Sequence, residues 1–167
     1  MSGHPRVPVA IALGSNLGDR LSHLNFAITR LGDLLADLKV SHIRETEPVG
    51  VAPQGRFLNS AAIGKTSLAA VDFLQQLLAI ERERGRQRPH VGAPRSLDLD
   101  LILYGDQIVR TQGLQVPHPR FRERVFVLEP LAEIAGSWLD PVTGQTVQEL
   151  LEALRKNETG RQPGPST

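Results

Sequence analysis

The order of apolar segments along the chain predicts an α+β fold with a ferredoxin-like core and additional helices at the C-terminus. Short apolar, β-branched runs bounded by glycine, proline or asparagine predict strands, and leucines recurring at helical spacing predict helices. These segments follow one another as strand, helix, two strands, helix and strand. We therefore expect a largely antiparallel sheet covered by helices.

The first strand and helix are the clearest segments. Val7 to Leu13 is an apolar run that stops at Gly14-Ser15-Asn16, which predicts a buried strand and a turn. Asp19 can cap the helix that follows. That helix has one apolar stripe, formed by Leu21, Leu24, Ile28, Leu31 and Leu35.

Two strands and a second helix come next. Lys39 to Thr46 and Phe57 to Lys65 are predicted as strands, separated by the proline- and glycine-containing loop Glu47 to Arg56. A helix is expected from Ala69 to Arg84, with an apolar face at Val71, Leu74, Leu77 and Leu78. Glu81 continues that face, where a carboxylate is costly without a partner. It either pairs with a neighbouring arginine at the helix end or faces a ligand.

The remaining segments are a loop, a strand, a hairpin and two helices. Their predicted bounds are Gly85 to Pro94 for the loop, Ser96 to Tyr104 for the strand, Gly105 to Arg110 for the hairpin, and Val125 to Ala135 and Val147 to Arg155 for the helices. Prolines keep Val116 to Pro119 out of a central strand. Pro130 is expected near a helix start or bend.

Length and composition predict one soluble domain. The 167 residues are 40% hydrophobic, and we expect residues 1–156 to form the domain and polar residues 157–167 a disordered tail. The formal charge of +1 argues against a protein whose whole surface binds polyanions such as nucleic acid. No apolar run approaches the roughly 20 residues of a membrane span, and the chain contains no cysteine. A cytoplasmic monomer is expected.

The most informative segment is Ser96 to Tyr104, where leucine and aspartate alternate. Strand geometry puts Leu97, Leu99, Leu101 and Leu103 on one face and Asp98 and Asp100 together on the other. The two aspartate Cα atoms would be about 6.6–7 Å apart, so their charges would repel by roughly 2–3 kcal/mol. Magnesium uses one or two carboxylates together with substrate phosphates. We favour a metal site over a solvated strand face with incidental aspartates.

Arginines are concentrated around this strand. Arg86, Arg88 and Arg95 flank it, and planar guanidinium groups donate in pairs to phosphate oxygens. His118, between two prolines, and Arg124 offer further donors, although a single histidine is more often structural. As a group, these residues indicate a polyphosphate held against the metal. Neither a P-loop motif nor a dinucleotide-binding glycine motif is present.

From Val9 to Leu151 the chain resembles the 6-hydroxymethyl-7,8-dihydropterin pyrophosphokinases. Several motifs carry the resemblance and occur in family order: Gly14-Ser15-Asn16, Phe57-Leu58-Asn59, Gly85-Arg86-Gln87-Arg88, Ala93 to Asp100, Pro117-His118-Pro119-Arg120, and Glu123 to Leu128. Two positions differ from some members: Gly92 replaces a tryptophan, and Pro89 replaces a lysine in a loop one residue shorter.

The resemblance implies transfer of a diphosphate from ATP to the hydroxymethyl group of a reduced pterin in folate biosynthesis. The implied roles are two magnesium ions at Asp98 and Asp100, stabilisation of the transferring charge by Arg86 and Arg95, ATP binding by Glu81, Arg88, His118 and Arg124, and pterin binding by Thr46, Pro48, Val49, Phe57, Asn59 and Phe126. Flat heteroaromatic rings stack on aromatic side chains, and an asparagine amide offers both a donor and an acceptor. Core packing is the alternative for either phenylalanine.

Two other classes of protein fit part of the pattern. An RNA-binding module would share the topology and the arginine-rich loops, but the aromatic content of 4% and the paired aspartates weigh against it. A two-metal nucleotidyltransferase would also place paired aspartates on a strand. Its product distinguishes it, because AMP transfer releases diphosphate whereas diphosphate transfer releases AMP.

Overall fold

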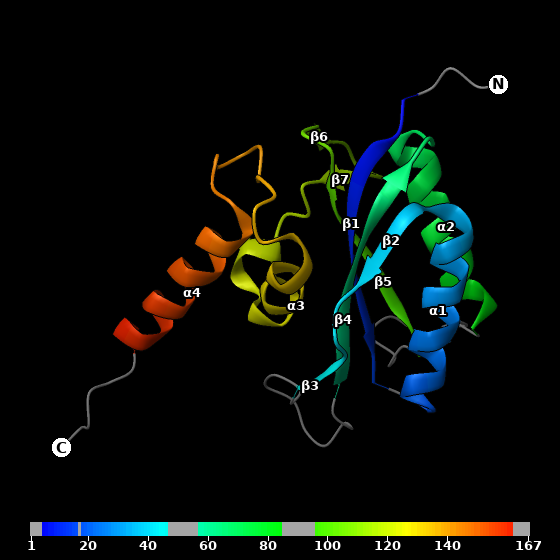
Figure 1. Cartoon of the computed structure of the whole chain (residues 1–167), viewed down its shortest axis with the longest axis horizontal. Helices are drawn as coiled ribbons and strands as arrows, with labels where there is room; N and C mark the ends of the chain where they lie inside the picture. Colours follow the sequence, from blue (N-terminus) through cyan, green and yellow to red (C-terminus); the bar gives the residue numbers. More distant parts are fainter. Residues whose placement is uncertain (1–4, 17, 47–56, 85–95, 162–167) are drawn as a thin grey trace.

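An antiparallel sheet lies between two layers of helices in the computed structural model (Figure 1). The structure describes residues 5–16, 18–46, 57–84 and 96–161, with side chains to residue 158. The strands are β1 (Val7–Ser15), β2 (Ala36–Val40), β3 (Arg44–Thr46), β4 (Phe57–Thr66), β5 (Asp98–Tyr104), β6 (Val109–Arg110) and β7 (Gln115–Val116). The helices are α1 (Arg20–Leu34), α2 (Ala70–Glu83), α3 (Val125–Ala135) and α4 (Val147–Arg161), with a short 3-10 turn, η1 (Phe121–Glu123).

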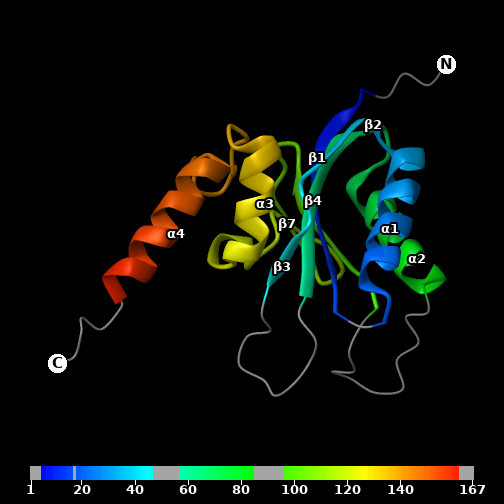
Figure 2. The same cartoon turned by 60° about the horizontal axis from the view of Figure 1, so that its bottom comes forward.

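The strand order confirms the predicted ferredoxin-like core. The main sheet runs β2-β4-β1-β5, β3 adds to β4, and all of these pairs are antiparallel. Helices α1 and α2 cover one face of the sheet, while α3 covers the other and α4 packs outside it (Figure 2). As predicted, Asp19 caps α1, because its side chain accepts a hydrogen bond from the Ser22 amide at 3.1 Å.

The central strand β1 has faces of different size, and this division positions the site. Val9, Ile11 and Leu13 are buried under α1 and α2, whereas Ala10 and Ala12 face α3 and α4. Bulky β-branched and leucine side chains fill the first layer, while alanines let the second layer of helices lie close to the backbone. Along β1, the layer of side chains is therefore thick on the face under α1 and α2 and thin on the face under α3.

The predicted strand Lys39 to Thr46 is broken in the structure. Residues 41–43 separate β2 from β3, because the Ser41 side chain replaces part of the backbone ladder. The Ser41 amide donates to the Ala61 carbonyl at 2.8 Å, but the Ala61 amide donates to Ser41 Oγ at 2.9 Å. A hydroxyl that competes for backbone partners ends the regular ladder at this point.

The prediction that Leu103 shares a face with the preceding leucines is wrong. Leu97, Leu99 and Leu101 do pack under α1 and α2, but Leu103 packs on the α3 side. The β1–β5 register shifts between Ala10 and Ile11, which leaves one extra residue in β5 and reverses the alternation. Asp98 and Asp100 precede this irregularity and keep a common face.

One expectation for the later segments is also corrected. The turn at Gly105 and Asp106 exists, with Gly105 at a φ of 54°, but β6 pairs with β7 and does not fold back on β5. The Gly105 amide donates to the Pro8 carbonyl at 2.7 Å, which extends the contact of β5 with β1. Pro130 lies within α3.

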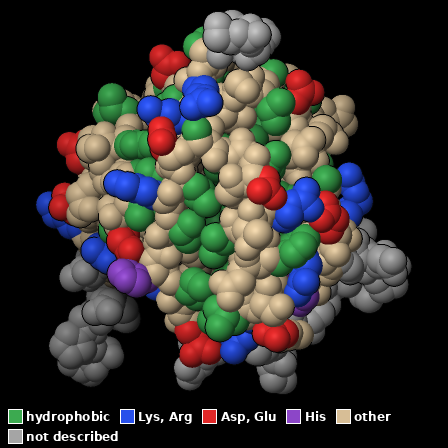
Figure 3. Space-filling view, turned by 45° about the vertical axis from the view of Figure 1, so that its right-hand side comes forward, with side chains coloured by type: hydrophobic (Ala, Val, Ile, Leu, Met, Phe, Trp, Pro, Cys, Tyr) green, Lys and Arg blue, Asp and Glu red, His purple; other side chains and the backbone are tan. Residues whose placement is uncertain are grey.

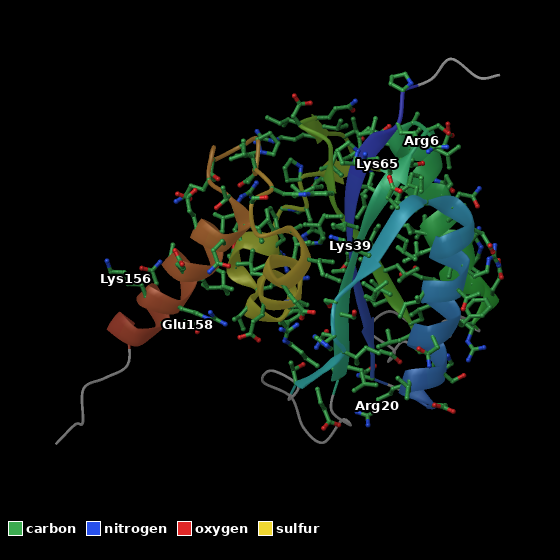
Figure 4. All side chains as sticks on the ribbon, viewed as in Figure 1. Arg6, Arg20, Lys39, Lys65, Lys156 and Glu158 are labelled. Atoms are coloured by element: carbon green, nitrogen blue, oxygen red, sulfur yellow. The ribbon has the colours of Figure 1, made fainter. Side chains whose placement is uncertain are left out.

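The C-terminal helix is longer than expected. Helix α4 continues to Arg161, beyond the helix end predicted at Arg155, while residues 162–167 lie outside the described residues. Leu150 and Leu151 anchor its first turns in the core, and an established helix lengthens at little cost per residue. Lys156 and Glu158 lie on the part of α4 that extends away from the sheet (Figure 4).

Acidic and basic side chains alternate on one face of the molecule. Figure 3 shows acidic and basic side chains interspersed on the side of the molecule that carries α1 and α2, in keeping with the balanced composition. No helix among residues 5–16, 18–46, 57–84 and 96–161 is long and apolar enough to cross a membrane.

A buried ion pair holds the segment before α4. The fully buried Asp140 accepts two hydrogen bonds from Arg122, at 2.5 and 2.9 Å, and others from the Val142 amide and the Thr143 hydroxyl. Burial alone raises the pKa of Asp140, but the hydrogen bonds from Arg122, Thr143 and Val142 outweigh it, so the pKa is lowered. The pair connects η1 to the turn that leads into α4.

Replacing Asp140 with alanine is expected to destabilise the protein by about 3 kcal/mol, because it leaves the Arg122 guanidinium without its partner. Chemical denaturation measures this loss, and Asp106→Ala, at an exposed turn, serves as a control with an effect within about 0.5 kcal/mol. Because the folded-state pKa is lowered, the contribution is complete above about pH 4 and is lost as the pH falls through the lowered value. Equal stability of the two variants would contradict a stabilising role for the Arg122–Asp140 ion pair.

Candidate active site

A pocket of about 320 Å³ lies between the sheet and the N-terminal end of α3. It is lined by Ala12, Leu13, Gly14, Thr46, Phe57, Asn59, Asp98, Asp100, Arg124, Phe126 and Val127. These residues come from five separate segments, namely four strands of the sheet and the start of α3. The size and the mixture of aromatic walls with a few polar groups are typical of a small-molecule site.

Small residues form the floor of this pocket. Gly14 lies opposite Asn59 on one side and opposite Asp98 on the other, and the next row places Ala12 between Ala61 and Asp100. A Cβ atom at Gly14 would lie 3.4 Å from Asn59 Oδ1. The glycine and alanines therefore leave a shallow floor between an amide and two carboxylates, on which a flat ring can lie.

Aromatic and polar side chains form the walls. Phe57 comes from β4 and Phe126 from α3, and the Arg124 guanidinium lies 5.8 Å from the centre of the Phe126 ring. Asn59 Nδ2 donates to Thr46 Oγ1 at 2.6 Å, which joins β4 to β3 at the edge of the pocket. The amide of Asn59 is thus held in one orientation by a neighbouring strand.

A second pocket of about 360 Å³ lies beside the outer edge of β5. Its lining residues come from α2, β5 and the segment 112–119 and include Leu74, Leu78, Glu81, Asp98, Asp100 and His118. Asp98 and Asp100 line both pockets. The paired carboxylates therefore lie where two different ligands would meet.

Glu81 holds the strand that carries the aspartates. Its side chain is 2% exposed, and Oε2 accepts a hydrogen bond from the Leu99 amide at 2.7 Å, between Asp98 and Asp100 in the sequence. The Ser15 hydroxyl donates to the Ser96 carbonyl just before β5. The sequence left arginine pairing and ligand binding open for Glu81, and this backbone contact is an additional role that its helical position did not reveal.

His118 lies in the second pocket as a neutral imidazole at pH 7. Burial lowers its pKa, the positive charges of Arg124 and Arg120 lower it further, and Asp98 raises it in part. Nδ1 accepts a hydrogen bond from the Arg120 amide at 3.1 Å, so the ring proton resides on Nε2. His118 can therefore donate one hydrogen bond to a ligand.

The structure brings nine of the predicted site residues to the two pockets: Thr46, Phe57, Asn59, Glu81, Asp98, Asp100, His118, Arg124 and Phe126. The predicted residues Pro48, Val49, Arg86, Arg88 and Arg95 lie outside the described residues. Sequence reasoning missed the pocket floor at Ala12 and Gly14. The signal was available, because small residues alternate with large ones from Val9 to Gly14.

Asp98 and Asp100 suit a magnesium ion that keeps part of its water and phosphate shell. The described residues contain no group of three or more histidine, cysteine, aspartate or glutamate side chains arranged for a metal. A site with only two carboxylates cannot enclose an ion by itself, but it matches the way magnesium binds together with substrate phosphates.

Comparison with known proteins gives one consistent result. The family model for 7,8-dihydro-6-hydroxymethylpterin-pyrophosphokinase matches residues 10–136. The 2-amino-4-hydroxy-6-hydroxymethyldihydropteridine pyrophosphokinase of Bacillus subtilis is 48% identical over 126 residues, covering 74% of this chain and 75% of the relative. The folic acid synthesis protein fol1 of Pneumocystis carinii is 38% identical over 147 residues, covering 87% of this chain and 20% of that protein.

A solved structure supports the fold. The wild-type HPPK-DHPS of Plasmodium falciparum with SDX-DHP matches with a TM-score of 0.78 at 12% identity. The match covers 97% of this chain and 47% of that one, so the chain spans about half the length of the solved protein.

The pKa of His118 is expected to lie below its ordinary value of 6.5 and to rise in Arg124→Gln, because that change removes a neighbouring positive charge. NMR titration of the imidazole measures both effects. Arg110→Gln is the matched control and should leave the titration unchanged, since Arg110 is not among the charges that shift His118. A wild-type pKa above 6.5 would contradict the lowering of the His118 pKa by burial and the neighbouring arginines.

Proposed function

The chain belongs to the 7,8-dihydro-6-hydroxymethylpterin-pyrophosphokinase family, and from this we propose how its residues move a diphosphate from ATP to the pterin. The protein is a pyrophosphokinase of folate synthesis that acts on hydroxymethyldihydropterin. One observation carries the mechanism: Asp98 and Asp100 line both pockets. Each pocket then holds one substrate, and the reacting groups meet at the carboxylates.

The pterin occupies the pocket between the sheet and α3. Its flat ring lies over Gly14 and between Phe57 and Phe126, where stacking and burial favour it. Asn59, held by Thr46, supplies an amide that matches the donor and acceptor edge of the ring. The proposed contacts with Pro48 and Val49 fall outside the described residues.

ATP occupies the pocket at the outer edge of β5. Glu81 and His118 line it, and the neutral His118 offers one donor from Nε2 to the nucleotide. Arg124 lines the neighbouring pocket and lowers the pKa of His118, and this supports a role for its charge between the two proposed substrate sites. Arg88 is proposed to bind the phosphates as well, because guanidinium groups donate in pairs to phosphate oxygens.

Asp98 and Asp100 are proposed to hold two magnesium ions with the ATP phosphates. When bound, these ions neutralise phosphate charge and orient the phosphates for displacement. Such cations would offset the repulsion between the two carboxylates, which share one strand face. Glu81 supports them by fixing the backbone at Leu99.

Transfer proceeds by attack of the pterin hydroxyl oxygen on the β phosphorus. A new oxygen–phosphorus bond forms, the bond from the β phosphorus to the bridging α–β oxygen breaks, and AMP leaves while the hydroxyl proton passes to solvent. Arg86 and Arg95 are proposed to stabilise the charge on the transferring group. Positioning and charge neutralisation supply most of the catalysis in such reactions. The cytoplasmic location and monomeric state stay predictions from the sequence.

Coupled turnover with ATP, magnesium and the hydroxymethyl pterin is expected to give AMP and pterin diphosphate in equal amounts. Chromatography of the products, with a reaction lacking pterin as control, measures this ratio. ADP as the coupled product would indicate ordinary phosphoryl transfer. Released diphosphate with an adenylated pterin would indicate a nucleotidyltransferase.

Asp98→Asn and Asp100→Asn should each lower kcat/KM by about 100-fold or more while leaving the fold intact, because each removes a carboxylate at the meeting point of the substrates. Steady-state kinetics over a range of magnesium concentrations measures the loss, and circular dichroism checks the fold. Asp106→Asn, on an exposed turn, is the control. Folded variants with wild-type turnover would contradict the assignment.

A further inference from the structure

Glu133 ties the far end of α3 to the edge of the sheet. Its Oε2 accepts a hydrogen bond from the His42 amide at 3.0 Å and lies 2.8 Å from His42 Nδ1. Its Oε1 lies 2.9 Å from Arg44 Nη1. The His42 backbone hydrogen bond, together with the charges of His42 and Arg44, outweighs burial and lowers the pKa of Glu133. One carboxylate therefore contacts two residues at the edge of the sheet, His42 between β2 and β3 and Arg44 at the start of β3.

His42 lies in the break of the edge strand, and Arg44 is the first residue after it. Residues 41–43 do not continue the ladder, and β3 starts again at Arg44 with its own register against β4. The Ser41 hydroxyl forms hydrogen bonds with the Ser60 hydroxyl and the Ala61 amide of β4. The next amide, of His42, donates to Glu133 on α3 and not to β4. The location of β3 thus depends on α3 as well as on strand pairing.

Strand β3 in turn holds the polar edge of the first pocket. Arg44 lies directly opposite Asn59, and Thr46 lies opposite Phe57. Thr46 Oγ1 accepts the hydrogen bond that orients Asn59. Because β3 is only three residues long, few ladder hydrogen bonds fix its register.

We propose that Glu133 is a positioning residue for pterin recognition, which acts through Arg44 and β3 on Asn59 and Thr46. This inference rests on the proposed function, because it concerns the pocket assigned to the pterin. Glu133 does not line either pocket and touches no reacting atom. It holds α3, which carries Phe126, and β3, which carries Thr46, at a fixed separation.

Glu133→Gln keeps the shape of the side chain and removes the charge that pairs with Arg44. We expect the KM for the pterin to rise about tenfold, with the KM for ATP and kcat each within about threefold of wild type. Fluorescence titration with the pterin should show the same loss in equilibrium binding. Arg44→Gln should reproduce the effect, and the double variant should be no worse than either single variant, because the two residues act as one unit.

Glu129→Gln is the matched control. Glu129 lies one helical turn earlier on α3 and pairs with Arg155 of α4 at 2.5 Å, so its loss also removes an ion pair of α3 but leaves β3 untouched. Its kinetic constants should match those of wild type. Thermal unfolding of all variants separates a loss of stability from a change in substrate binding.

Several outcomes would overturn the proposal: an unchanged pterin KM in either Glu133→Gln or Arg44→Gln, equal losses for pterin and ATP, or the same loss in Glu129→Gln. If Glu133→Gln does not fold, Arg44→Gln decides the question by itself. Pterin turnover by the wild-type enzyme distinguishes failure of the Glu133 proposal from failure of the proposed function. Absence of pterin turnover in wild type would refute the function, whereas normal turnover with unaffected variants would refute only the role of Glu133.

Discussion

Asp98 and Asp100 place two negative charges on the same face of β5, and the rest of the site depends on holding them there. Alternate strand residues lie about 6.6–7 Å apart, so the two charges repel by roughly 2–3 kcal/mol. The opposite face of the strand compensates, since Leu97, Leu99 and Leu101 are buried under α1 and α2. Glu81 adds a hydrogen bond to the backbone between the aspartates. The hydrophobic core thus keeps the two carboxylates side by side on one strand face.

The division of β1 into large and small faces gives the site its space. Val9, Ile11 and Leu13 build the core beneath α1 and α2, while Ala10 and Ala12 let α3 lie close to the sheet. Figure 2 shows the consequence, with α3 and α4 on the side of the sheet opposite α1 and α2. Near the start of α3 the close packing gives way to the pocket over Gly14. The same pattern of side-chain sizes that builds the fold also makes room for a flat substrate.

The sequence predicted the features that follow from local periodicity. Strand alternation put Asp98 and Asp100 on one face, and helical spacing located α1, α2 and α3 to within a few residues, including the cap at Asp19. The reversed direction of Leu103 was not predictable, because it depends on a register shift against β1 that pairing alone creates. The break in the edge strand was missed for a related reason. Nothing in the local sequence shows that the Ser41 hydroxyl accepts a hydrogen bond from the Ala61 amide, because Ala61 lies on another strand.

Whether Asp98 and Asp100 lie between two separate substrates can be seen in a crystal structure of the ternary complex. The crystal would contain manganese in place of magnesium, the pterin and an ATP analogue with a methylene group between the α and β phosphorus atoms. We expect the pterin between Phe57 and Phe126, the nucleotide beside Glu81 and His118, and anomalous peaks at ligand distance from the carboxylate oxygens of Asp98 and Asp100. Both ligands in one pocket, or metal peaks away from these carboxylates, would contradict this arrangement.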